Sequence, residues 1–242
     1  LMGSCLTYRA VSVQHQRASD QLESDNLRAK SILFDATLNF YNLTEELLSD
    51  KALQEILTKE YPPQERSIEP TRDYNRLSRI LKNNTSIAAL RVYTTNATIG
   101  RDKIIQNEYS EKVETWFEQV KVPGSIRWES SSELSADNMT ELLLIRSIPL
   151  PNSEHSAIVV MSMSNNFLKN RIQNNRLFLS LSINQDPIFF STVRMLQGTQ
   201  ETAPIDYEQR YFQSTGDITY LGDSAFSFIS SLTPYRTGET IY

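Results

Sequence analysis

The first quarter of the chain lacks the residues that break helices, because neither glycine nor proline occurs from Ser4 to Tyr61. Within this stretch one set of positions recurs at alternating spacings of four and three residues: Leu22, Asn26, Ala29, Leu33, Ala36, Phe40, Leu43 and Leu47. This spacing places the set along one stripe of an α-helix. We therefore predict a single long helix over residues 6–49.

Composition excludes several classes of protein. The chain has 242 residues, of which 39% are apolar, so it can bury a substantial core. Its net charge is −5, without a basic tract, so we expect no nucleic-acid surface. The single cysteine, Cys5, leaves no partner for an internal disulfide. No apolar run is long enough to span a bilayer, so any membrane spans are expected outside this sequence.

Shorter helices and strands are predicted between the long helix and residue 125. Three helices are expected, with these caps and apolar faces: Asp50 with Leu53, Ile56 and Leu57; Thr71 with Tyr74, Leu77 and Leu81; and Ser110 with Val113, Trp116, Phe117 and Val120. A strand is expected from Ile87 to Thr94 and another from Ala97 to Ile105, the second weakened by Gly100.

The remaining chain completes this mixed pattern and then restarts it after residue 174. Strands are expected at 125–129, 141–149 and 155–164, followed by a short helix at 164–174. A hairpin of 177–183 with 188–190, a helix at 192–198, and strands at 217–221, 225–232 and 239–242 then complete the chain. We divide the chain into a helical stalk, residues 1–61, a larger unit, residues 62–174, and a smaller unit, residues 175–242.

Several stretches resemble a known family of sensor domains. They are the strand Ile87–Thr94, the pair Trp116–Phe117, Trp128, and Leu144–Ile148, with 178–190, 226–232 and Thr237–Gly238 in the smaller unit. In this order they resemble the double Cache domain, and most closely the extracytoplasmic part of YesM-type sensor histidine kinases. The resemblance implies an α+β fold in which one long helix carries two PAS-like antiparallel-sheet units.

The resemblance also implies a function. We expect a ligand-sensing domain on the extracytoplasmic side of a bacterial cell membrane, in a histidine kinase of a two-component system. The long helix would pass a ligand-dependent change toward the membrane. Alternatives are the ectodomain of a chemoreceptor or another Cache-bearing receptor, and a stand-alone surface solute-binding protein. The expected partner is an unidentified small molecule, with a carbohydrate as the first guess, or a binding protein that carries one.

Five residues are candidates for the ligand site: Arg91, Tyr93, Trp116, Trp128 and Arg146. On the strand 87–94, Leu90 and Val92 share one face, whereas Arg91 and Tyr93 share the other. If the first face packs on the long helix, the second points to a pocket. A guanidinium group fits a carboxylate or phosphate, and aromatic rings fit a sugar or another ligand with an apolar face. The alternative is that the tryptophans belong to the core and the arginines pair with local carboxylates.

Catalytic and metal-binding patterns are not found in the sequence. The two histidines, His15 and His155, are far apart, and no metal-ligand spacing or phosphate-binding loop occurs. We therefore expect no enzyme activity from this chain and no cofactor or metal. The seam of the long helix is expected to pack on the chain's own sheets, and near Leu22 and Asn26 also on a second copy, giving a homodimer. We also expect Arg146→Ala to abolish ligand binding with little loss of folding.

Overall fold

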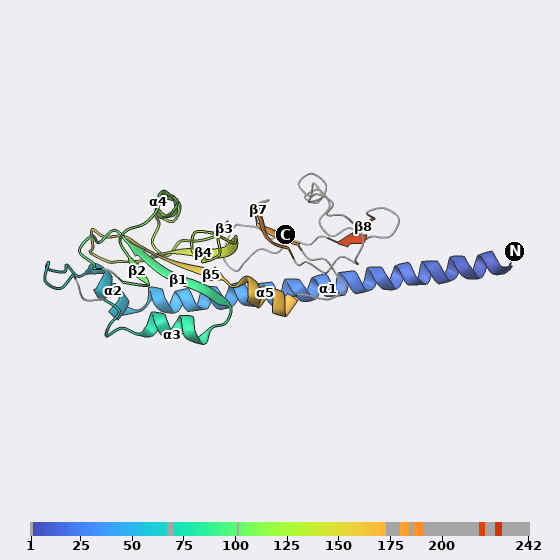
Figure 1. The fold of residues 1–242 in the computed structure, drawn as a ribbon, viewed down its shortest axis with the longest axis horizontal. Helices are drawn as coiled ribbons and strands as arrows, with labels where there is room; N and C mark the ends of the chain where they lie inside the picture. Colours follow the sequence, from blue (N-terminus) through green and yellow to red (C-terminus); the bar gives the residue numbers. More distant parts are fainter. Residues whose placement is uncertain are drawn as a thin grey trace.

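A helix that runs along most of the molecule dominates the structure (Figure 1). The computed structural model describes residues 2–66, 70–100, 102–172, 180–183, 186–190, 218–220 and 226–228, with side chains described for residues 10–66, 70–100, 102–172, 181 and 183. Helix α1, Met2–Leu48, has 47 residues. At 1.5 Å per residue it is about 70 Å long. The predicted long helix is therefore confirmed.

Helix α1 is buried along only part of its length. Ala29, Leu33 and Phe40 are buried, whereas residues 10–18 are exposed. The helix ends where Asp50 caps α2, Lys51–Thr58, by accepting hydrogen bonds from the backbone N–H groups of Ala52 and Leu53. This cap and the second helix were both predicted from the sequence.

A five-stranded sheet packs on the buried half of α1. Its strands are β1, Ile87–Thr94; β2, Ile105–Gln106; β3, Ile126–Ser131; β4, Glu141–Ile148; and β5, Ala157–Met163. Their order across the sheet is β2-β1-β5-β4-β3. All neighbouring pairs are antiparallel except β1 and β2, which are parallel. The sheet is thus mixed, and the prediction of a purely antiparallel sheet is wrong for this edge.

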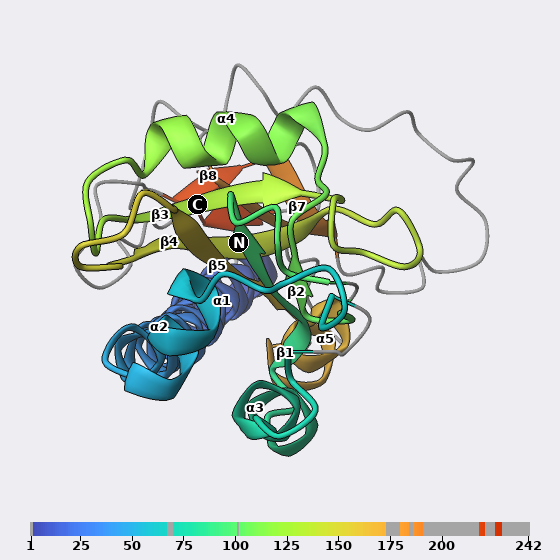
Figure 2. The same ribbon diagram turned by 90° about the vertical axis from the view of Figure 1, so that its left-hand side faces the viewer.

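The sheet lies between two helical layers (Figure 2). Helix α1, with α2 and α3 (Arg76–Asn83), covers one face, and α4 (Glu111–Gln119) lies on the other. Strands β4 and β5 are buried at every position, as expected for strands covered on both sides. Leu90 and Leu144 belong to the α1-side core, whereas Leu143 and Val160 belong to the α4-side core.

The second predicted strand is mostly turn. Instead of a strand from Ala97 to Ile105, only Ile105–Gln106 pairs with β1. The buried side chain of Asn96 donates to the carbonyl groups of Leu57 and Lys59, which holds the segment against the end of α2. A Cβ atom at Gly100 would lie 1.6 Å from the carbonyl oxygen of Arg66, so this position requires glycine.

The cap predicted for the third helix is also wrong. Helix α3 begins at Arg76, after Asn75, whose side chain makes no capping hydrogen bond. Thr71 instead bonds through its hydroxyl and backbone N–H groups to the carboxylate of Asp102. The same carboxylate accepts hydrogen bonds from the N–H groups of Ile104 and Ile105. Asp102 thus fixes the start of β2 and engages Thr71, which leaves Thr71 unavailable as a helix cap.

The described part of the C-terminal third contains one helix and two hairpins. They are α5, Asn165–Ile172; β6, Ser180–Ile183, paired with β7, Asp186–Phe190; and β8, Ile218–Tyr220, paired with β9, Phe226–Phe228. Leu181 and Ile183 are buried in the α1-side core. The helix predicted at 192–198 and the strand predicted at 239–242 lie outside the described residues. The chain has an α+β fold.

Candidate functional site

The five candidate ligand residues lie on two opposite faces of the sheet. Tyr93 and Trp116 belong to the α4-side core. Arg91 pairs with Val160 of that core and alternates along β1 with residues that face α1, so it lies on the α4 side too. Trp128 belongs to the α1-side core, and Arg146 bonds to α1 itself. The sheet separates the two groups, so they do not form one site.

Helix α4 positions the α4-side group. Ser110 begins the helix by accepting a hydrogen bond from the N–H of Val113, and its hydroxyl donates to Glu133 at 2.7 Å. The apolar stripe predicted from the sequence turns Val113, Trp116 and Val120 toward the sheet, where all three are buried. The hydrogen bond between Ser110 and Glu133 joins the start of α4 to the loop after β3 at one end of this face.

Aromatic rings form a row at that end. The ring of Tyr93 on β1 meets Tyr109 edge-to-face, with centroids 6.0 Å apart and planes at 80°. Tyr109 in turn packs on Phe117 of α4, with centroids 5.3 Å apart. Tyr109 and Phe117 are half-buried. We call Arg91, Tyr93, Tyr109, Trp116, Phe117 and Glu133 the α4-side cluster.

The α4-side cluster also contains polar groups suited to a ligand. The indole Nε1 of Trp116 is buried and has no hydrogen-bond acceptor. Burial raises the pKa of the Tyr93 phenol to about 12, and the charge of Glu133 also raises it, whereas Arg91 opposes this effect. Arg91 is half-buried, with one nitrogen donating to the carbonyl of Leu90. The cluster therefore offers donors, a carboxylate acceptor and aromatic edges.

Arg146 forms a clamp on the opposite face. Its Nη1 donates to the Thr44 hydroxyl at 3.0 Å and its Nη2 to the Glu45 carboxylate at 2.5 Å. The guanidinium lies over the Tyr41 ring, 4.6 Å from the centroid, and contacts the Tyr41 carbonyl oxygen at 3.4 Å. We call Tyr41, Thr44, Glu45 and Arg146 the helix clamp. It fastens the middle of β4 to one turn of α1.

Trp128 supports the same face. It is 1% exposed, and its ring packs on Phe40 of α1 with centroids 5.9 Å apart. Trp128 and Arg146 are thus used in joining the sheet to the long helix. For these two residues the core and ion-pair alternative describes the contacts that the structure contains.

Three members of the α4-side cluster were not candidates for the site from the sequence. Phe117 was predicted only as part of the apolar stripe of its helix. Tyr109 immediately precedes the helix cap Ser110, and an aromatic residue beside a predicted cap was the available signal. Glu133 lies in a loop, and its contact with Ser110 spans 23 positions. No local pattern could have indicated that contact.

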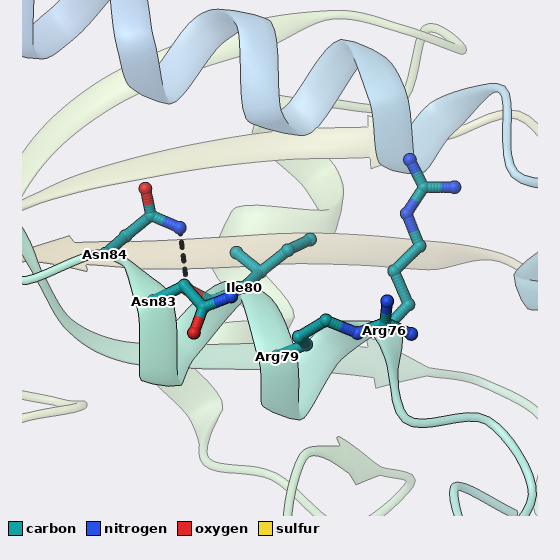
Figure 3. Close-up of a pocket in the computed structure, with 5 residues that line it drawn as sticks. All are labelled: Arg76, Arg79, Ile80, Asn83 and Asn84. Carbon is teal, nitrogen blue, oxygen red and sulfur yellow. Dashed lines mark hydrogen bonds between the residues drawn. The ribbon is translucent and has the colours of Figure 1, made fainter.

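A pocket lies on the other side of the sheet, at α3. It has a volume of about 440 Å³ and is lined by Arg76, Arg79, Ile80, Asn83 and Asn84 (Figure 3). None of these residues was a candidate from the sequence. In the described part of the chain, no group of three or more His, Cys, Asp and Glu side chains could hold a metal ion.

Comparison with known proteins does not assign the chain to a family. No family model matches the sequence, and no curated protein matches it. Within the described ranges, no helix combines the length and apolar character needed to cross a membrane. The Cache resemblance therefore stays a prediction, and the function is argued below from the geometry.

Proposed function

We propose that this chain is the ligand-sensing, extracytoplasmic part of a bacterial membrane-bound sensor histidine kinase, built as a double Cache domain. One observation carries the proposal: the same helix forms part of the sheet's core and extends far beyond it. Ala29 to Leu48 contribute to the α1-side core, whereas residues 10–18 are exposed. A continuous helix is a stiff connection between a sheet and a distant point.

The α4-side cluster is the proposed sensing site. It lies on the sheet face opposite α1, so a ligand there would act on the helix through the strands that both faces share. The unpartnered Trp116 N–H is a reason for a ligand to bind, because a buried donor without an acceptor is costly. A polyhydroxylated ligand such as a carbohydrate, free or on a binding protein, could supply the acceptor and stack on the rings.

The proposal includes a pair of α1 helices. Residues 10–18 of α1 are exposed, and most of the stability of helices in proteins comes from packing of a helix face rather than from propensity. A second copy packed along α1 from this segment to Leu22 and Asn26 would cover it. Sedimentation analysis tests this point: a strictly monomeric chain at high concentration contradicts the dimer without affecting the sensing site.

A ligand screen tests the sensing site. The chain has two tryptophans, so Trp128→Phe leaves Trp116 as the only indole reporter. We expect a member of a panel of sugars, carboxylates and amino acids to raise the melting temperature and change Trp116 emission. Arg91→Gln should weaken binding, whereas Arg127→Gln, at the other edge of the sheet, should not.

Two results would contradict the proposed site. One is a stabilising ligand that leaves Trp116 emission unchanged. The other is equal weakening by Arg91→Gln and Arg127→Gln, which would indicate a general effect of charge.

A further inference from the structure

The pocket at α3 is separate from the proposed sensing site. Its lining residues Arg76, Arg79, Ile80 and Asn83 belong to α3, and Asn84 follows that helix. Helix α3 lies on the α1 side of the sheet, whereas α4 lies on the other (Figure 2). The volume of about 440 Å³ falls within the range of roughly 300–1,000 Å³ found for small-molecule sites.

One wall of the pocket is held rigid by charge pairs. Figure 3 shows Arg76 reaching from α3 toward α1. There its Nη1 bonds to Asp50 at 3.0 Å and its Nη2 to Glu46 at 3.1 Å. The Tyr74 hydroxyl donates to the same oxygen of Asp50 at 2.8 Å. Arg76 is therefore oriented by the protein, and its charge is largely balanced by these two carboxylates.

Arg79 provides the charge that remains available. Its Nη2 donates to the amide oxygen of Asn75 at 2.6 Å. Its side chain takes part in no ion pair that the structure records among the described residues. A guanidinium has five donors in a planar fork, so this single bond leaves donors for a ligand.

The other lining groups define the rest of the ligand. Asn84 donates through its amide nitrogen to the carbonyl of Ile80 at 2.7 Å. The amide oxygen of Asn84 therefore points away from that carbonyl and can accept a hydrogen bond from a ligand. Asn83 is exposed and offers both a donor and an acceptor. Ile80 supplies apolar contact. None of the five lining residues is acidic, and none is aromatic, so an anion is favoured over a stacked sugar.

We propose that the α3 pocket is a second binding site, specific for a small organic carboxylate. The carboxylate pairs with Arg79, its carbon chain contacts Ile80, and a polar group farther along bonds to Asn83 and Asn84. Arg76 forms the fixed wall beside Arg79. This proposal goes beyond the sensing function and does not depend on it.

Calorimetric titration with succinate tests the proposal, with chloride added to keep the ionic strength constant. Arg79→Gln should weaken succinate binding by about tenfold or more, because the charged bond is lost. Lys82→Gln is the matched control, since Lys82 is an exposed cation on the same helix that does not line the pocket. It should change the affinity by less than about twofold. Succinamide, the uncharged analogue, should not bind.

Amide NMR spectra locate the bound succinate. We expect shifts of the side-chain amide signals of Asn83 and Asn84 and no change on mutation of Arg91 in the α4-side cluster. Three results would overturn the proposal: no heat of binding with succinate, equal loss in Arg79→Gln and Lys82→Gln, or shifts confined to the α4-side cluster. Circular dichroism of each variant checks that the fold is retained. A failure here would leave the proposed sensing site untouched, because that site is tested with Arg91 and Trp116.

Discussion

Arg146 is 4% exposed, and its charge is compensated by groups on α1. Its donors reach the side chains of Thr44 and Glu45, and its planar group covers the Tyr41 ring. A buried guanidinium requires such partners, because the loss of its hydration is costly. The helix clamp is therefore a stabilising contact between the sheet and the long helix, and this changes what mutation of Arg146 should do.

Arg146→Ala is expected to destabilise the fold. The substitution removes the three hydrogen bonds to Tyr41, Thr44 and Glu45 and the buried aliphatic stem, whereas Glu45, with a side chain 56% exposed, can be rehydrated. We expect the free energy of unfolding in urea to fall by about 2–3 kcal/mol. Arg127→Ala is the control: its side chain is 37% exposed and 3.7 Å from Glu129. It should cost about 0.5 kcal/mol. Equal effects of the two substitutions would show that the clamp adds no stability.

Asp50 makes the stability of the fold depend on pH. Burial raises the pKa of its carboxyl group, but hydrogen bonds from Tyr74 and the Leu53 N–H and the charge of Arg76 outweigh burial, so the pKa is lowered from its usual 3.8. The unfolded chain therefore takes up the proton at higher pH than the folded chain. The stabilisation is complete above the usual pKa and is lost as the pH falls through the lowered, folded-state pKa.

Asp50→Asn tests this dependence. Asparagine also caps helices, so the main loss is that of the charged contacts with Tyr74 and Arg76. We expect the variant to be less stable than the wild type at pH 7 by about 1–2 kcal/mol. The difference should shrink as the pH is lowered below the usual pKa, because protonation removes the same charge from the wild type. Urea denaturation at several pH values measures this difference in stability, and a difference independent of pH would contradict the role given to the Asp50 charge.

At the residue scale, the sequence predicted the face of the sheet on which a side chain lies better than the residues that the side chain contacts. Alternation along β1 correctly placed Leu90 and Val92 toward α1 and Tyr93 away from it. It could not show that Arg146 faces α1, because its strand, β4, is apolar on both faces and has no visible alternation. Trp128, on β3, faces α1 as well. The partners of Arg146 lie about a hundred positions away. The expectation that Arg146→Ala costs little folding stability conflicts with the burial of its side chain.

Elements with local signals were predicted best. Helices α1, α2 and α4 have an apolar stripe, and α2 and α4 also begin at a capping side chain. The caps bond within three residues, so the sequence alone indicates them. The predictions of strand β2 and of the start of α3 were wrong because Asn96 and Asp102 bond to distant segments. Their local propensities were overridden by contacts that span more than thirty positions.

Helix α1 should show a gradient of stability along its length. Leu33 is 5% exposed within the α1-side core, whereas Val13 is 49% exposed. Leu33→Ala should lower the free energy of unfolding by about 2–4 kcal/mol, because it leaves a cavity. In dilute solution, where the chain is monomeric, Val13→Ala on the same helix should change it by less than about 0.5 kcal/mol. Urea denaturation in dilute solution compares the two variants, and a large cost for Val13→Ala there would contradict the gradient. At high concentration the proposed dimer would cover this part of α1, so the cost of Val13→Ala should rise with concentration.

At the scale of the whole molecule, one sheet supports two cores. The α1-side and α4-side cores are formed by alternate residues of the same strands, such as Leu144 and Leu143 of β4. Leu181 of β6 extends the α1-side core beyond the five-stranded sheet. Layers that share their strands are expected to lose their packing together, since unpairing the strands exposes both faces.

The two tryptophans allow this cooperativity to be measured. Trp116 lies in the α4-side core and Trp128 in the α1-side core, each at most 1% exposed. In Trp128→Phe the fluorescence reports only the α4 layer, and in Trp116→Phe only the α1 layer. Within each variant, the urea midpoint from fluorescence should equal the midpoint from far-UV circular dichroism, which is dominated by the helices. The comparison is made inside one variant, so any destabilisation by the substitution itself cancels. A lower fluorescence midpoint in Trp128→Phe alone would show instead that α4 opens before the sheet unfolds, and the α4-side cluster would then be a separable cover rather than part of one cooperative unit.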